Sequence, residues 1–128
     1  MANEARPTDD RPPVWIGHVH MHTDRLEASH QFLLAAGLRP IARGEAFAVL
    51  ELRGGTHLVL SWRASVAPGP APFDLMVDDI EIAHRHMDEA GLAPSAILDG
   101  HIHRSFTVTD PSGQVLIVNS SHVSDLPV

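Results

Sequence analysis

The chain has 128 residues, 44% of them hydrophobic and 20% charged, which is the composition of a single globular domain rather than of a disordered chain. A formal net charge of −7 argues against nucleic acid or an anionic membrane as a partner, and no apolar run approaches the roughly 20 residues that span a bilayer. The absence of cysteine excludes disulfides, thiolate metal sites and a cysteine nucleophile, and we expect a cytoplasmic protein.

The first half of the chain predicts a strand, a helix and three further strands. Asp24 followed by Glu27 is typical of a helix N-terminus, and Gly37 is typical of the end of that helix. The pair Gly54-Gly55 predicts a hairpin turn between the last two strands. The expected strands are residues 14–22, 39–43, 46–53 and 56–62.

The second half repeats this order after the proline-rich run SVAPGPAP. A shift of 54 residues places Ala36-Gly37-Leu38 onto Ala90-Gly91-Leu92, so a second helix is expected to end there. Asp78 followed by Glu81 predicts the start of that helix, and Pro111-Ser112-Gly113 predicts the last turn. The expected strands are residues 72–77, 95–98, 103–109 and 114–119.

This repeat predicts an α+β fold in which two βαβββ modules of one chain form a curved mixed sheet, with the helices on its convex face. Module one is expected at 14–63, a linker at 64–71 and module two at 72–121. The modules would form one domain, 14–121, between a flexible N-terminal tail at 1–13 and a C-terminal tail at 122–128.

The first strand carries three alternating histidines in the run HVHMH. Side chains alternate across a strand, so His18, His20 and His22 share one face while Val19 and Met21 share the other. The apolar pair suits the face under the helix. We therefore expect the three histidines on the open face of the sheet.

Strand geometry limits what these histidines could bind. Strand residues at positions i and i+4 lie about 13 Å apart, so one metal ion cannot take all three side chains. Two of them could bind an ion together with a ligand from another strand. His57 is the best candidate for that ligand, and Asp74 is the next.

Three segments are characteristic of a known family: HVHMHTDRLEASHQFLLAAGL, VDDIEIAHRHMDEAGL and DPSGQVLIV. With the duplicated module, they resemble the vicinal oxygen chelate superfamily, which includes glyoxalases, extradiol dioxygenases, fosfomycin-resistance enzymes and bleomycin-binding proteins. The resemblance covers residues 14 to about 120 and implies a single glyoxalase/bleomycin-resistance-like domain.

The resemblance also implies where metal ligands would stand, since enzymes of the family place them on the first and last strands of each module. His18 matches the first ligand position. Val59, Pro72 and Ile117 stand at the other three positions, and their side chains offer no donor to a divalent ion. The resemblance therefore supports the fold and argues against the metal site of the family.

Our leading interpretation is a protein that binds a small organic molecule without a metal ion or other cofactor and that assembles as a homodimer. A protein of this type resembles the antibiotic-sequestering members of the superfamily. No catalytic residue is assigned. The expected ligand-binding residues are His18, His20, His22, His57, Trp62, Asp74 and Met76.

Two alternatives stay open at this point. One is an enzyme, a glyoxalase-like lyase, an isomerase or an extradiol-type dioxygenase, whose displaced divalent metal site is drawn from His18, His20, His57 and Asp74. The other is a domain whose open face serves only to dimerise.

Overall fold

The computed structural model describes residues 9–121 and 126–128, so the tails expected at 1–13 and 122–128 lie partly outside the described residues. Module one contains β1 (His18–Thr23), α1 (Leu26–Ala36), β2 (Arg39–Arg43), β3 (Phe47–Glu51), the 3-10 turn η2 (Arg53–Gly55) and β4 (His57–Trp62). Module two contains β5 (Gly69–Pro70), β6 (Leu75–Val77), α2 (Ile80–Glu89), β7 (Leu98–Asp99), β8 (Arg104–Thr109) and β9 (Gln114–Ser120).

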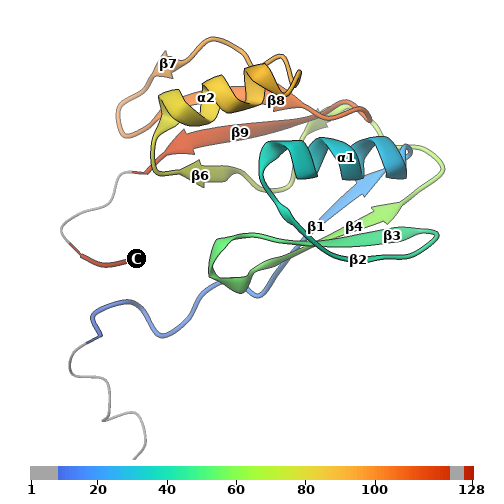
Figure 1. Ribbon diagram of the computed structural model, residues 1–128, viewed down its shortest axis with the longest axis horizontal. Coiled ribbons are helices and arrows are strands. Elements are labelled where there is room, and N and C mark those ends of the chain that lie inside the picture. The colour runs from blue at the N-terminus through green and yellow to red at the C-terminus, as the bar shows by residue number, and fades with distance from the viewer. Residues whose placement is uncertain (1–8, 122–125) are drawn as a thin grey trace, which may run out of the picture.

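The strands form two mixed sheets, each with a helix against one face (Figure 1). The first sheet has the order β1-β4-β3-β2, and the second has the order β5-β9-β8-β7 with β6 also paired to β9. In the first sheet β1 runs parallel to β4, and in the second sheet β5 and β6 both run parallel to β9. The expected α+β fold of two βαβββ modules is confirmed, with the difference that no strand pair joins the two sheets in the described residues.

One apolar core runs through both modules because inward side chains alternate along every long strand. In module one, Met21, Leu58 and Leu60 are fully buried beneath α1, which contributes Leu33. The corresponding buried residues of module two are Phe106, Val108, Leu116 and Val118, together with Ile80 and Met87 of α2. Each such side chain contributes about 1.5–3 kcal/mol through its burial, which commits this face of each sheet to the core.

A buried chain of hydrogen bonds also links the modules. The Ser29 hydroxyl of α1 donates to Asp110 Oδ2 at 2.6 Å, in the turn between β8 and β9. A hydroxyl has one proton, so the 2.7 Å contact between Thr23 and Ser29 has Thr23 as its donor. Asp110 Oδ1 accepts from the backbone N–H groups of Ser112 and Gln114. This network holds the end of β1 and the start of α1 against the last turn of module two.

Several boundaries differ from the sequence-based expectation. β1 begins at His18 rather than at residue 14. The expected cap at Asp24 is wrong, because α1 starts after Arg25, which makes no side-chain cap. In α2 the cap is Asp79 rather than Asp78, and its carboxylate accepts from two backbone N–H groups at 3.0 Å. No helix of the described residues is both long enough and apolar enough to cross a membrane.

Candidate functional site

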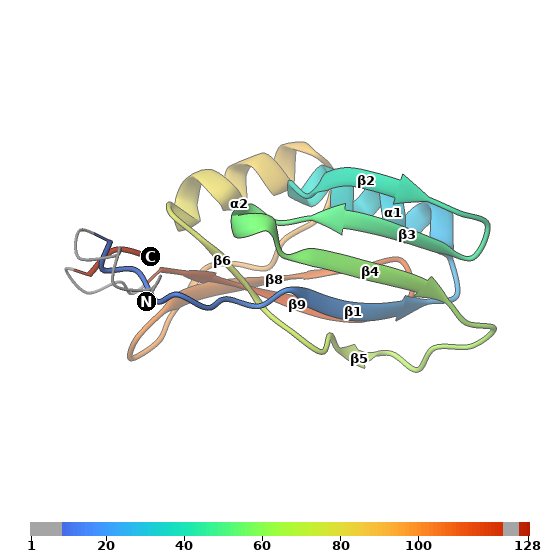
Figure 2. The same cartoon turned by 90° about the horizontal axis from the view of Figure 1, so that it is seen from below.

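The histidines of β1 lie on the face that the alternation predicts. Met21 is fully buried, whereas His18 and His20 are exposed and His22 is half-buried. Figure 2 looks onto this side of the first sheet and shows α1 behind it. We call this surface the open face and define it by the outward side chains of three strands, namely His18, His20, His22, Phe47, Val49, Glu51, His57, Val59 and Ser61.

Four side chains form one polar row across the first sheet. The strand register places His18 beside His57, His57 beside Glu51 and Glu51 beside Arg39. The rings of His18 and His57 meet edge to face, with centroids 5.9 Å apart. His57 Nε2 lies 3.0 Å from Glu51 Oε2, and Arg39 Nε donates to Glu51 Oε1 at 3.0 Å. We call these four residues the polar row.

The charge of Glu51 decides how the polar row is bonded. The Arg39 guanidinium, and after it the hydrogen bond from His57, hold the pKa of Glu51 below its ordinary value. An ionised carboxylate can only accept hydrogen bonds, so Nε2 of His57 carries the proton and donates. The polar row therefore orients the His57 ring and fixes which nitrogen bears hydrogen.

Apolar side chains border the polar row on the same face. The next register row contains His20, Val59 and Val49, and the one after it contains His22, Ser61 and Phe47. Phe47 is 43% exposed, although phenylalanine side chains are usually buried. The open face thus offers oriented polar groups beside apolar surface, which suits an amphipathic molecule.

The remaining expected site residues do not join this cluster. Trp62 is half exposed, but it follows Ser61 in β4 and is paired with the buried Thr23, which places it on the helix side of the sheet. Met76 lies in β6 of the second sheet, and Asp74 directly precedes that strand, where it accepts from Asn119 Nδ2 at 3.2 Å. In the described part of the chain, no hydrogen bond or ion pair joins either of them to the polar row.

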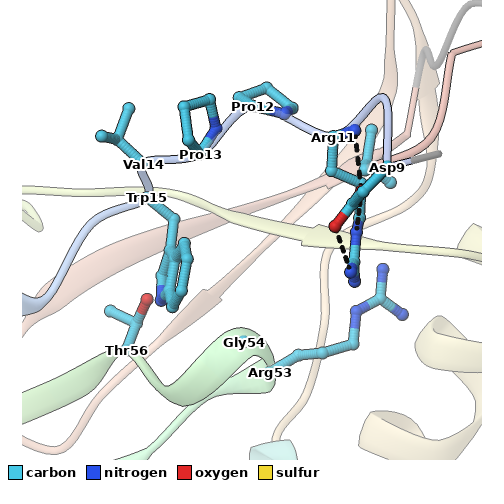
Figure 3. A pocket seen from close by; sticks show the side chains of 10 residues that line it. Asp9, Arg11, Pro12, Pro13, Val14, Trp15, Arg53, Gly54 and Thr56 are labelled. Carbon is cyan, nitrogen blue, oxygen red and sulfur yellow. Dashed lines mark hydrogen bonds and ion pairs between the residues drawn. The ribbon is translucent and has the colours of Figure 1, made fainter. Parts of the chain in front are cut away.

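A cavity of about 650 Å³ lies between the segment before β1 and the turn η2, and none of the expected site residues lines it. Figure 3 shows Trp15 beside Thr56 in its wall, and Arg11 with Asp9 near Arg53. Arg11 is bonded to Asp9 at 2.9 Å, and Arg53 is bonded to Asp78 at 2.7 Å. Since its cationic groups are already paired with carboxylates, we place the candidate site on the open face and not in this cavity.

The donors present do not fit a metal centre. Among residues 9–121 and 126–128, no group of three or more His, Asp or Glu side chains is arranged to hold an ion. Of the displaced metal ligands considered from the sequence, His57 lies in β4 of the first sheet, whereas Asp74 directly precedes β6 of the second. The arrangement instead favours hydrogen bonding to an organic group.

Glu51 and Arg39 were not expected in the site. A hairpin centred on Gly54 places residue 51 opposite residue 57, so the contact between Glu51 and His57 could have been found from the turn alone. Arg39 is harder to place, because a register shift between Pro40 and Ala42 interrupts the pairing of β2 with β3.

The sequence matches no family model and no curated protein. Solved structures are similar in fold. A lactoylglutathione lyase from Agrobacterium tumefaciens has a TM-score of 0.74 at 16% identity, covering 91% of this chain and all of that one. A glyoxalase/bleomycin resistance protein from Catenulispora acidiphila has a TM-score of 0.70 at 18% identity, covering 84% of this chain and 99% of that one. A bleomycin-binding protein complexed with bleomycin has a TM-score of 0.66 at 14% identity, covering 84% of this chain and 98% of that one.

Proposed function

Because the chain has the vicinal oxygen chelate fold, we propose that it binds a small organic molecule on the open face of its first sheet, without a metal ion. The observation that carries the proposal is the polar row, in which His18, His57, Glu51 and Arg39 lie in register across four strands. A few oriented polar groups beside apolar surface are what small-molecule sites present to their ligands.

Two further features support a ligand on this face. His18 and His20 are exposed, and no hydrogen bond to the described residues occupies their rings. One solved protein with this fold is a bleomycin-binding protein that holds bleomycin, so the fold can accommodate an organic ligand.

The metal-free part of the proposal rests on donor chemistry. Val59 and Ile117, at two positions where the family resemblance implies ligands, carry aliphatic side chains, and Pro72 at a third has no donor. Across the sheet, the imidazole of His57 lies beside that of His18, and its Nε2 is bonded to Glu51. Nδ1 of His57 remains free, but among residues 9–121 and 126–128 no group of three or more His, Asp or Glu side chains is arranged to hold a divalent ion.

The experiment is elemental analysis of protein purified without a histidine tag, combined with NMR screening of aromatic fragments against labelled protein. We expect no stoichiometric Fe, Zn, Ni or Mn. Fragment-induced shifts should cluster on β1, β3 and β4, and they should weaken in His57→Ala but not in His86→Ala, which changes an exposed histidine of α2. One equivalent of bound metal that is lost in His18→Ala would refute the proposal and favour a metal-dependent enzyme.

A further inference from the structure

The hydrogen-bonding state of His57 restricts what the ligand can be. Oε1 of Glu51 accepts a hydrogen bond from Arg39, and Oε2 accepts one from His57. The Glu51 side chain is 17% exposed. Arg39 already balances the carboxylate charge, so the contact with His57 does not require a charged imidazole. A neutral imidazole has one N–H, and here that group must be Nε2–H, because the carboxylate has no proton to give.

The other nitrogen of the ring, Nδ1, is then an acceptor with a free lone pair. No hydrogen bond to another described residue engages it, and it is not among the buried side-chain atoms that lack a partner, so it is open to solvent. The His57 side chain as a whole is 33% exposed. A molecule that displaces water from this point must donate a hydrogen bond, or it leaves an acceptor unpaired.

The surface around Nδ1 indicates the shape of the group that carries this donor. Successive rows on one face of a strand are about 6.6–7 Å apart, which is close to the length of an aromatic ring with its substituent. The row next to His57 is apolar at Val59 and Val49, both half-buried. A flat ring can therefore lie over the two valines while its substituent reaches His57.

From this geometry we infer that the ligand class of the open face is a planar phenol or enol, whose hydroxyl donates to Nδ1 of His57. This inference rests on the proposed function, since it specifies the ligand of the same site. Because Glu51 holds His57 in the Nε2–H form, the site should prefer molecules that donate a hydrogen bond to Nδ1 over molecules that can only accept one.

The tautomer can be measured on the unmodified protein. The ¹⁵N shifts of imidazole nitrogens separate an N–H from a lone pair, and we expect the Nε2–H form for His57 at neutral pH. A spectrum that shows Nδ1–H for His57 would overturn the inference at once, even if the protein binds ligands.

Selectivity is tested with two matched probes, 2-naphthol and 2-methoxynaphthalene, in which a methyl group replaces the hydroxyl hydrogen and removes the donor. NMR titration should show shifts on the open face for both, with 2-naphthol binding roughly three- to tenfold more tightly, the value of one neutral hydrogen bond. In Glu51→Gln an amide replaces the carboxylate and can donate to His57 or accept from it, so the preference should shrink toward one. In Glu45→Gln, which changes an exposed glutamate before β3, the preference should persist.

The outcomes separate the two claims. If both probes bind the open face equally well, the inference about a donating ligand is wrong and the proposed function stands. If neither probe moves resonances of the open face, the proposed function fails and the inference falls with it. If Glu51→Gln keeps the full preference for 2-naphthol, Glu51 does not set the tautomer, and the inference is again overturned.

Discussion

His20 and Met21 are neighbours in the sequence, yet their side chains enter opposite environments. Met21 is fully buried beneath α1, whereas His20 is exposed on the open face. Met21→Ala should leave a cavity and lower the free energy of unfolding by about 2–5 kcal/mol. His20→Ala removes an exposed side chain and should change it by no more than about 0.5 kcal/mol.

Urea denaturation of the two variants provides the measurement. If the free energy of unfolding falls with urea at a similar slope in both variants but the unfolding midpoints differ, only the stability has changed. If His20→Ala were the more destabilising variant, the histidines of β1 would belong to a buried network. The ligand site on the open face would then have to be withdrawn.

The charge of Glu51 links the polar row to the pH dependence of stability. Its pKa is lowered in the folded protein, chiefly by Arg39 and then by His57. The resulting stabilisation is fully present above the unfolded-state pKa of about 4.3 and is lost as the pH falls through the lowered folded-state pKa. Wild-type protein should therefore lose more stability on acidification below pH about 5 than Glu51→Gln does.

Urea midpoints for both proteins across the acid range test this, with Glu45→Gln as the control, because Glu45 is an exposed glutamate outside the polar row. The gap between wild type and Glu51→Gln should close toward low pH. A gap of constant size would mean that Glu51 contributes by packing rather than by charge.

At the scale of the elements, α2 depends on a single cap. Asp79 accepts hydrogen bonds from the backbone N–H groups of Glu81 and Ile82, which otherwise lack partners within the helix. Asp79→Ala should lower the free energy of unfolding by about 0.5–2 kcal/mol. Asp78→Ala is the matched control, because Asp78 makes only an exposed ion pair with Arg53 and should matter less. Thermal or urea unfolding would contradict this assignment if Asp78→Ala proved the costlier change.

The elements themselves could be predicted because their signals are local. The duplicated Gly-Leu endings fix the ends of both helices, and Gly37 does adopt the left-handed conformation there, with φ of 118°. The predicted starts were each wrong by one residue, because Arg25 rather than Asp24 precedes α1 and Asp79 rather than the adjacent Asp78 caps α2. β1 proved shorter than expected, as the apolar residues before His18 extend the pattern beyond the strand that β4 can pair.

The site was predictable only in part, for a similar reason. Alternation places His18 and His20 on the open face from the sequence alone. His30 of α1 is buried, which no local pattern of the sequence indicates. The relation of Asp74 and Met76 to the histidines depends on how the two sheets are arranged, and no local pattern encodes that.

At the scale of the whole molecule, the buried bonds from Ser29 to Asp110 and from Thr23 to Ser29 connect the modules while both sheets keep an uncovered face. Apolar side chains stand on these faces: Phe47 is 43% exposed, Ile117 is 41% exposed and Met76 is 54% exposed. Apolar surface of this kind on two faces of one small protein is commonly covered by a partner. A second copy of the chain is the simplest partner, because symmetry lets one surface serve both subunits.

We therefore predict a homodimer that covers the apolar side chains of the second sheet around Ile117 and leaves the open face of the first sheet to the ligand. Light scattering at about 100 µM, well above the dissociation constant of a stable interface, should give twice the mass of the chain. Ile117→Asp, on β9, should shift the protein toward monomer. Ile82→Asp is the matched control, because Ile82 is equally exposed at 42% but lies on α2, and it should leave the dimer intact. A monomeric wild type at this concentration would contradict the prediction, and a dimer broken only by Ile82→Asp would move the interface to the helices.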